Sequence, residues 1–258
     1  MQYDYEWFKQ EIFKLTSIDL NAYKEQQMKR RIESLILRNN LDGYYGFYRK
    51  MLIDKELKDI FLSYITINVS EFYRNPEQWE VLEKNILPEL IKKNGKKLTV
   101  WSAACSTGDE PYTLVMILAK FIPIEDVKVI ATDLDKNILD KARIGIYDER
   151  CLAGLPGEYK TKYFTKVGDK YEISPIIKSK VTFKQHNLLK DDYIKNCDFI
   201  ACRNVLIYFT EEAKNDIFSK IKNSLKKNGV FFIGSTEQIS NYKVFDLERK
   251  EMYFYGKS

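Results

Sequence analysis

The chain has 258 residues and a net charge of +5, from 42 basic and 37 acidic side chains, and it is 45% hydrophobic. Its length suits one large domain or a medium and a small one, and its hydrophobic fraction excludes a disordered chain. No apolar run reaches the ~20 residues that cross a bilayer, and we expect no secretory signal in the polar first ten residues.

The four cysteines form no C-x-x-C pair, and the sequence has a single histidine, His186. Neither a zinc site nor a hydrolase built on a catalytic histidine is therefore predicted. We expect four reduced thiols, no bound metal and a cytoplasmic protein.

Residues 1–66 are predicted to form a small helical domain. Apolar residues recur there at three- and four-residue spacing, as in Met28, Ile32 and Leu35, and no strand pattern appears. Asp42-Gly43 predicts a break between helices. From Ile67 on, the pattern changes.

Residues 67–258 alternate between predicted helices and short buried strands. The helices are expected at 76–93, 111–121, 136–143 and 211–227, and the strands at 98–102, 127–132, 197–202 and 230–234. This alternation predicts an α/β fold with a doubly wound, mostly parallel sheet. A last strand at 252–255 is expected at the edge of the sheet, antiparallel. Residues 163–173 alternate around Gly168-Asp169, which predicts an inserted β-hairpin.

Residues 103–112 follow the first predicted strand, where ligands bind in open α/β sheets. The loop is rich in small residues and has a single glycine, Gly108, so a pyrophosphate-binding loop is not predicted. Asp109 and Glu110 would repel a phosphate but suit an ammonium or sulfonium group. The alternative is that these acids only favour the start of a helix.

Asp133 ends the second predicted strand, where a carboxylate can accept hydrogen bonds from a ribose diol. Acids at strand ends are common, so this residue alone is weak support. Together with the loop of small residues, however, it indicates an adenosine ligand without phosphates, and S-adenosylmethionine (SAM) fits.

Two further segments combine polar and aromatic residues. After the strand at 197–202, Asn204 and Tyr208 offer hydrogen-bonding groups and an aromatic face for a cationic sulfur. The segment 67–76, between the two regions, has Asn, Ser, Glu and Arg among aromatics. The alternatives are core packing for residues 206–209 and a structural helix joint for 67–76.

These segments form an ordered set of motifs. They are Ile67–Arg74 (INVSEFYR), Trp101–Tyr112 (WSAACSTGDEPY), Ala131–Asp135, Asn187–Leu189, Cys202–Phe209 (CRNVLIYF) and Gly234–Glu237. The set resembles the CheR-type chemotaxis receptor glutamate methyltransferases, from about residue 10 to the end of the chain.

The resemblance implies an N-terminal helical receptor-recognition domain at 1–66 and a SAM-binding methyltransferase domain at 67–258, with a β-subdomain at about 160–183. It implies a monomer that transfers methyl from SAM to glutamate carboxylates of chemotaxis receptors, leaving S-adenosylhomocysteine. The partners would be the cytoplasmic helices of the receptors, with no nucleic acid and no membrane insertion.

The resemblance also implies residue roles. Glu110 would take the SAM ammonium, and Asp133 the ribose hydroxyls. The implied cofactor-binding residues are Asn68, Ser70, Arg74, Glu110, Asp133, Asn187, Leu188, Asn204 and Val205. Arg74 and Tyr208 would face the substrate as catalytic residues.

Two features depart from the family's usual pattern. Ser70 stands where the family often has Thr, which keeps the hydroxyl. The predicted hairpin turn at Gly168-Asp169 is short, whereas members that dock a receptor's C-terminal pentapeptide have a longer, glycine-rich loop there. We therefore predict a pentapeptide-independent enzyme.

Lys24, Arg31 and Arg38 are spaced seven apart and form one basic stripe beside the apolar face of a predicted helix. They are candidates for binding acidic receptor helices, and the alternative is an ordinary solvated face.

Two other functions stay open from the residues alone. One is methyl transfer to another protein, a small molecule or RNA, although the modest net charge disfavours RNA. The other is a non-catalytic SAM-binding regulatory module.

Overall fold

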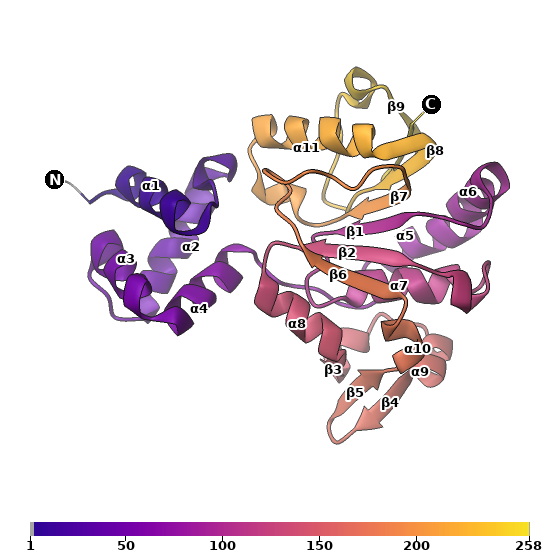
Figure 1. Cartoon of the computed structure of the whole chain (residues 1–258), viewed down its shortest axis with the longest axis horizontal. Coiled ribbons are helices and arrows are strands. Elements are labelled where there is room, and N and C mark those ends of the chain that lie inside the picture. The colour runs from indigo at the N-terminus through magenta and orange to yellow at the C-terminus, as the bar shows by residue number, and fades with distance from the viewer. Residues whose placement is uncertain (1–2, 258) are drawn as a thin grey trace. The chain divides into compact units, whose positions relative to one another are not determined.

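A computed structural model describes residues 3–257 of the chain. The chain divides into two compact units. The first runs through Asn68 and includes Tyr208–Asn215, and the second holds Val69–Ile207 and the chain from Asp216 on. The sequence did not predict that Tyr208–Asn215 groups with the N-terminal helices. Figure 1 labels the elements of both units.

The first unit is a helical bundle, as the apolar spacing predicts. Its helices are α1 Tyr5–Thr16, η1 Leu20–Ala22, α2 Glu25–Arg38, α3 Gly43–Ile53 and α4 Lys55–Ile65. Phe8, Phe47 and Phe61 are fully buried, with ring centroids 5.8 to 6.2 Å apart. This aromatic cluster joins α1, α3 and α4, and α2 packs with its own buried apolar face.

A short segment from late in the chain pairs with this bundle. Tyr23 and Phe209 form an antiparallel β-bridge, and their ring centroids lie 4.9 Å apart. The Lys24 amide donates a 2.9 Å hydrogen bond to the carbonyl of Tyr208, the last residue of η5 Leu206–Tyr208. The backbone of Tyr208 is thus fixed beside the first turn of α2.

The second unit is built on one seven-stranded sheet with the order β6-β2-β1-β7-β8-β10-β9. The strands in that order are Val181–Gln185, Val129–Asp133, Val100–Ala103, Cys197–Cys202, Leu225–Phe232, Phe254–Lys257 and Leu247–Glu251. The first five are parallel to one another, and β10 pairs antiparallel with both β8 and β9. The predicted doubly wound α/β class is confirmed.

Helices cover the sheet, as Figure 1 shows. The main ones are α5 Pro76–Val81, continued by the π-turn η2 Leu82–Ile86 and by α6 Leu87–Asn94, then α7 Asp109–Leu118, α8 Lys136–Ile144 and α11 Glu211–Ser224. The short ones are η3 Ile124–Asp126, η4 Glu149–Leu152, α9 Gly157–Tyr163, α10 Pro175–Lys178 and η6 Tyr242–Phe245. Among the described helices, none is long and apolar enough to cross a membrane.

The predicted hairpin is confirmed. Strands β4 Phe164–Val167 and β5 Lys170–Ile173 pair antiparallel around Gly168 and Asp169, and Gly168 has the left-handed φ of 63° that glycine adopts freely. A third strand, β3 Ile146–Asp148, pairs with β5 and was not predicted. Together these strands form a separate small sheet.

Two sequence expectations at the sheet were wrong, and two strands were missed. The helix expected at 211–227 ends at Ser224, and Leu225–Lys227 instead begin β8. The last strand is antiparallel, but it lies between β8 and β9 rather than at the edge. Strands β6 and β9 were not predicted at all. β9, Leu247–Glu251, is mostly charged, as exposed edge strands often are, and therefore lacks a buried-strand pattern.

A buried carboxylate ties the amino end of β7 to its surroundings. Asp198 is fully buried, and its Oδ2 accepts 2.7 Å hydrogen bonds from the Thr99 amide and from Lys226 Nζ. Its Oδ1 accepts from Asn94 at 2.8 Å. This network stabilises the end of the sheet away from the loops that follow the strands.

Candidate active site

The candidate site lies at the carboxyl edge of the parallel strands. From β1 the chain continues to β2 and β6 on one side, and β7 and β8 lie on the other. The strand order therefore reverses between β1 and β7, which is where open α/β sheets bind ligands. The loops that follow these strands supply the residues of the site.

The loop after β1 turns tightly across the edge of the sheet. Ala104, Ser106 and Gly108 have left-handed φ values of 60°, 49° and 90°. A Cβ on Gly108 would lie 3.0 Å from the Tyr112 ring, so only glycine fits there without a shift. The Cys105 amide donates to the Thr132 carbonyl at 2.9 Å, which ties the loop to β2.

Asp133, at the end of β2, is buried and faces this loop. Its Oδ2 accepts a 2.8 Å hydrogen bond from the Ser106 amide, and its Oδ1 accepts one of 3.0 Å from the Asp135 amide. Burial raises the pKa of Asp133 to about 6, against the opposing effect of these amides. Because a carboxylate has about four acceptor positions, Asp133 keeps capacity to accept from a diol.

Glu110, in the first turn of α7, is engaged from two strand ends. Ser102 Oγ of β1 donates to its Oε1 at 2.8 Å, and Arg203 Nη1, just after β7, lies 3.4 Å from its Oε2. Burial raises the pKa of Glu110, and the Arg203 charge opposes that rise. The arginine thereby favours the ionised carboxylate that a cationic ligand needs.

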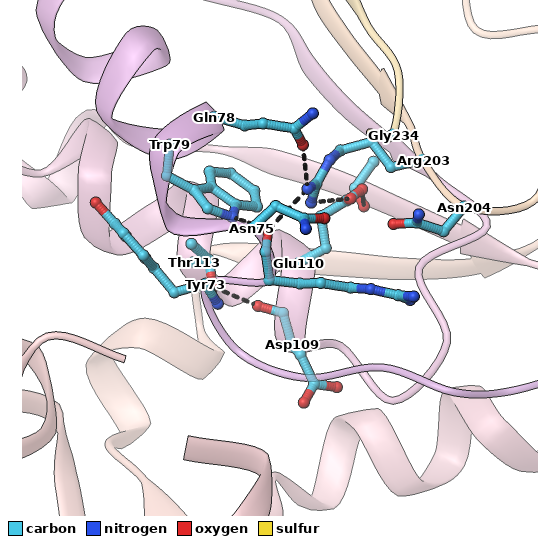
Figure 2. A network of polar contacts seen from close by, with 12 residues as sticks. Tyr73, Asn75, Gln78, Trp79, Asp109, Glu110, Thr113, Arg203, Asn204 and Gly234 are labelled. Carbon is cyan, nitrogen blue, oxygen red and sulfur yellow. Dashed lines mark hydrogen bonds and ion pairs between the residues drawn. The ribbon is translucent and has the colours of Figure 1, made fainter. Parts of the chain in front are cut away.

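Arg203 is the centre of the polar network in Figure 2. The side chain is buried, with its guanidinium carbon 4.8 Å from the Trp79 ring centroid and 4.5 Å from that of Phe232. Nη2 donates to Gln78 Oε1 at 2.7 Å and to the Arg74 carbonyl at 2.8 Å. One side chain thus links α5, the segment before it and Glu110.

The segment before α5 presents Arg74 from an anchored backbone. Phe72 is buried against the rings of Tyr147 and Phe164, at centroid distances of 4.7 and 5.1 Å. Tyr73 is also buried, whereas the Arg74 side chain is partly exposed, with Nη1 3.4 Å from the Val69 carbonyl. The chain therefore buries the aromatics and leaves the guanidinium accessible.

Glu237 organises the loop after β7. Its buried carboxylate accepts hydrogen bonds from the amides of Gly234, Asn204 and Leu206, at 2.7, 2.9 and 2.7 Å. Asn204 has a left-handed φ of 60°, and a Cβ on Gly234 would lie 2.9 Å from both the Asn204 amide nitrogen and Glu237 Oε2. This carboxylate therefore determines where Asn204 and Val205 lie.

The loop after β6 holds the residues expected near the adenine. The His186 amide donates to the Asp133 carbonyl at 2.9 Å, so Asn187 and Leu188 begin directly beside Asp133. Leu188 is buried, and Asn187 Oδ1 accepts from the Leu189 amide at 2.9 Å.

The single histidine, His186, is packed among aromatic rings. The ring of His186 meets those of Trp101 and Tyr193 edge to face, each at 5.4 Å, and Nε2 lies 3.3 Å from the Asp192 carbonyl. Burial lowers the pKa of His186, which favours a neutral ring.

Asp109 is a second buried acid in the loop. The hydroxyls of Thr107 and Ser70 hydrogen-bond its carboxylate and lower its pKa, but burial dominates and raises the pKa to about 6. Ser70, expected to line the cofactor, is therefore placed beside the first turn of α7.

We expect Asp109 to make stability depend on pH. The pKa of Asp109 is about 6 in the folded protein and about 3.9 in the unfolded chain, so the folded state binds the proton more tightly. As pH rises from about 4 to 6, loss of this proton therefore lowers the free energy of unfolding. In Asp109→Asn, urea denaturation should show a smaller decline in the free energy of unfolding. The difference in free energy of unfolding, variant minus wild type, should therefore rise by about 3 kcal/mol between pH 4 and pH 7. Exposed Asp126→Asn is the control, and parallel curves for Asp109→Asn and wild type would contradict the assignment.

Two of the expected site residues, Asn68 and Tyr208, belong to the first unit. Tyr208 lines a hollow of about 260 Å³ in that unit. The other lining residues are Lys24, Gln27, Met28, Arg30, Arg31 and Ile67. Of the predicted basic stripe, Lys24 and Arg31 therefore line the hollow.

Arg38 and Arg31 of the predicted stripe both pack on the ring of Tyr64, which does not line the hollow. Their guanidinium carbons lie 5.8 and 4.5 Å from the ring centroid of Tyr64, and Arg31 also donates to the Tyr64 carbonyl. Arg38 does not line the hollow, whereas Arg30, absent from the predicted stripe, does.

Sequence reasoning did not assign roles to Arg203 and Glu237. Arg203 stands directly after β7 and Glu237 stands in the loop after β8, within the quoted motifs CRNVLIYF and GSTE. A charged residue between a buried strand and a loop was the available signal. Their partners include residues 33 and 129 positions away in sequence, so these contacts became evident only in the fold.

Models of known families match both parts of the chain. The CheR methyltransferase SAM-binding domain matches residues 68–254, and the CheR methyltransferase all-alpha domain matches residues 3–66. The chain belongs to the CheR methyltransferase family. It is a SAM-dependent methyltransferase, which confirms the predicted cofactor and reaction class.

Chemotaxis protein methyltransferases of bacteria match nearly all or all of the chain. The chemotaxis protein methyltransferase of Listeria monocytogenes is 42% identical over 258 residues, which are 100% of this chain and 98% of that protein. Chemotaxis protein methyltransferase 1 of Pseudomonas aeruginosa is 34% identical and covers 92% of this chain and 91% of its own length. A solved glycopeptide N-methyltransferase, MtfA with sinefungin, is 12% identical with a TM-score of 0.38, over 64% of this chain and 50% of that chain.

The site of this CheR protein fits the groups of SAM. Asp133 is buried and the Glu110 side chain is only 12% exposed, and their carboxylates offer acceptors for a diol and an ammonium. The small-residue loop directly precedes Glu110 in sequence. Arg203 already contacts Glu110, but at 3.4 Å the bond is long and leaves acceptor capacity on the carboxylate.

Proposed function

We propose that this CheR protein transfers the methyl group of SAM to glutamate side chains of chemotaxis receptors, which gives glutamyl methyl esters and S-adenosylhomocysteine. The observation that carries the proposal is the link from Glu110 through Arg203 to Arg74. Arg203 contacts Glu110, whose carboxylate suits the cofactor's ammonium, and it also bonds the backbone carbonyl of Arg74. The partly exposed guanidinium of Arg74 suits a carboxylate substrate, and this supports the proposal.

The reaction needs positioning rather than a general base. When bound, SAM supplies a methyl group on a cationic sulfur. A glutamate side chain has an ordinary pKa of about 4.3 and is already ionised at neutral pH. The protein's task is to orient and partly desolvate that carboxylate. The buried His186 is then not required as a base.

Residue roles follow from this chemistry. Arg74 orients the substrate carboxylate, and Tyr208 donates a hydrogen bond to it. Glu110 holds the cofactor's ammonium and Asp133 its ribose. The remaining cofactor contacts come from Asn68, Ser70, Asn187, Leu188, Asn204 and Val205.

A direct test identifies the modified atom. Purified protein, SAM and a receptor cytoplasmic fragment are incubated, and the fragment is digested and sequenced by tandem mass spectrometry. The proposal predicts methyl groups on glutamate and their loss when those glutamates are replaced by aspartate or alanine. Methylation only of lysine, arginine or cysteine would contradict it.

The basic residues of α2 are proposed to bind acidic receptor helices in the cytoplasm. The hollow beside Tyr208 is lined by three cations, Lys24, Arg30 and Arg31, and by no carboxylate. This charge favours an anionic partner, and exposed charges steer such partners in a salt-dependent way.

Reversing the stripe is expected to impair receptor methylation selectively. The triple variant Lys24→Glu, Arg31→Glu, Arg38→Glu should lose about tenfold or more in kcat/KM at low salt, with a smaller loss at high salt, while SAM affinity stays unchanged. Because Arg31 also bonds the Tyr64 carbonyl, the double variant Lys24→Glu, Arg30→Glu tests the surface without breaking that contact.

The control for charge alone reverses exposed lysines elsewhere, Lys92, Lys96 and Lys97. If this control loses as much kcat/KM as the α2 variants, docking on α2 is wrong.

The enzyme is also proposed to act as a monomer without a receptor pentapeptide. The β4–β5 turn consists only of Gly168 and Asp169, which is too short for the glycine-rich loop of pentapeptide-dependent relatives. Calorimetry with a receptor C-terminal pentapeptide is expected to show no binding at micromolar concentrations. Saturable heats in that range would overturn the prediction.

A further inference from the structure

Arg203 makes contacts that none of the roles above explains. It is a buried guanidinium, and a buried charge is costly unless its donors are satisfied. The rings of Trp79 and Phe232 flank it. Its Nη1 is directed to Glu110, whereas Nη2 donates to Gln78 and to the Arg74 carbonyl. The two terminal nitrogens of the Arg203 guanidinium therefore contact different groups: Nη1 contacts the proposed cofactor carboxylate, and Nη2 the segment that carries Arg74.

The backbone around Arg74 needs such a contact. Tyr73 and Asn75 have left-handed φ values of 57° and 60°, an unfavourable conformation for residues with a side chain. The carbonyl between them, that of Arg74, accepts from two donors, Arg203 Nη2 at 2.8 Å and Trp79 Nε1 at 2.9 Å. Both bonds therefore hold the backbone of Arg74 in place. Figure 2 labels the donors Arg203 and Trp79 and the neighbours Tyr73 and Asn75.

We propose that Arg203 is a positioning residue that couples the cofactor carboxylate of Glu110 to the placement of Arg74. One planar fork holds both groups, so a shift at one is transmitted to the other. The inference rests on the proposed function, because it takes Arg74 as the group that orients the substrate. It adds that cofactor binding and substrate orientation share one side chain.

Three single variants separate the two halves of the fork. Ser102→Ala removes a contact of Glu110 only, and should weaken SAM binding several-fold in calorimetry with little change in kcat at saturating SAM. Trp79→Phe keeps an aromatic ring beside Arg203 but removes the Nε1 donor to the Arg74 carbonyl, and should lower kcat several-fold with little change in SAM affinity. Arg203→Lys keeps the charge but loses the fork, and should change both, with at least a tenfold loss in kcat.

A double-mutant cycle distinguishes positioning from general destabilisation. If Arg203 acts through Arg74, then Arg203→Lys should lower kcat less than about twofold when Arg74 is already alanine. Multiplicative losses would overturn the proposal, as would an Arg203→Lys variant with wild-type kcat and SAM affinity.

Asp198→Asn is the matched control for lost stability. Asp198 is also buried and charged and lies near the other end of β7, away from the loops of the site. It should destabilise the fold but leave kcat per folded enzyme within twofold. A tenfold loss there would show that kcat follows stability, and would overturn the proposal.

The two claims fail in different ways. If wild-type protein binds SAM but methylates no receptor glutamate, the proposed function fails, and the role of Arg203 at Arg74 fails with it. If wild type is active and the cycle is multiplicative, only the positioning role fails.

Discussion

Replacing Arg74 with alanine is expected to lower kcat for receptor methylation by about 10²-fold, the cost of misplacing a reacting group by about 1 Å. The side chain is partly exposed, while its carbonyl is held by Arg203 and Trp79. The guanidinium is thus preorganised on a fixed peptide group. Without it, the substrate carboxylate would have to be oriented by water and by the remaining residues.

The accompanying variants make this result specific. Arg74→Lys keeps a point charge without the planar fork and should fall between wild type and alanine. SAM affinity should change less than tenfold in Arg74→Ala, since Glu110 and Asp133 remain. Arg150→Ala removes an exposed arginine with a relative exposure of 85% and should leave kcat within twofold. Arg74→Ala with more than half the wild-type kcat would show that another group orients the substrate.

Glu237→Gln is expected to have the largest effect on the fold of the site. The carboxylate accepts from three backbone amides, and hydrogen bonds to a charged acceptor contribute about 1.5–3 kcal/mol each. A glutamine presents one acceptor oxygen, and its amide group would face donors. We expect the free energy of unfolding to fall by about 3–5 kcal/mol.

Glu237→Gln should also weaken SAM binding. Because Glu237 positions the amides of Asn204 and Leu206, SAM affinity should fall by about 100-fold, or about 2.7 kcal/mol. Urea denaturation and calorimetry in the same buffer measure both effects. The neighbouring exposed Gln238→Ala is the control and should change neither. Wild-type SAM affinity in folded Glu237→Gln would show that the loop after β7 does not bind the cofactor.

Local sequence signals predicted the fold where burial and periodicity agree. Cys197–Cys202 is a short apolar run and forms β7 with the predicted bounds, buried throughout. Leu225–Lys227 continue the amphipathic pattern of the preceding helix, but they begin β8. Leu225 pairs with Cys197 of β7, where the register shifts between Cys197 and Phe199. There the pairing between strands overrides the local preference, which a single sequence does not reveal.

The site was predictable residue by residue but not contact by contact. Asp133 and Glu110 could be found because Asp133 ends a strand and Glu110 lies in the first turn of the helix after another. The link from Arg203 to Arg74 joins residues 129 positions apart, and depends on how the segment before α5 returns to the end of β7. Spacing in one sequence carries no information about that return.

The central claim is that the methyl group is transferred to a receptor glutamate carboxylate. The most direct test uses methyl-labelled SAM, the purified full chain and a receptor cytoplasmic fragment, with Arg74→Ala in parallel. Mild alkali cleaves glutamyl methyl esters, so the label on the fragment should be released as methanol, and the variant should produce far less of it. Label that is transferred but survives alkali, or SAM binding without any transfer, would contradict carboxyl methylation.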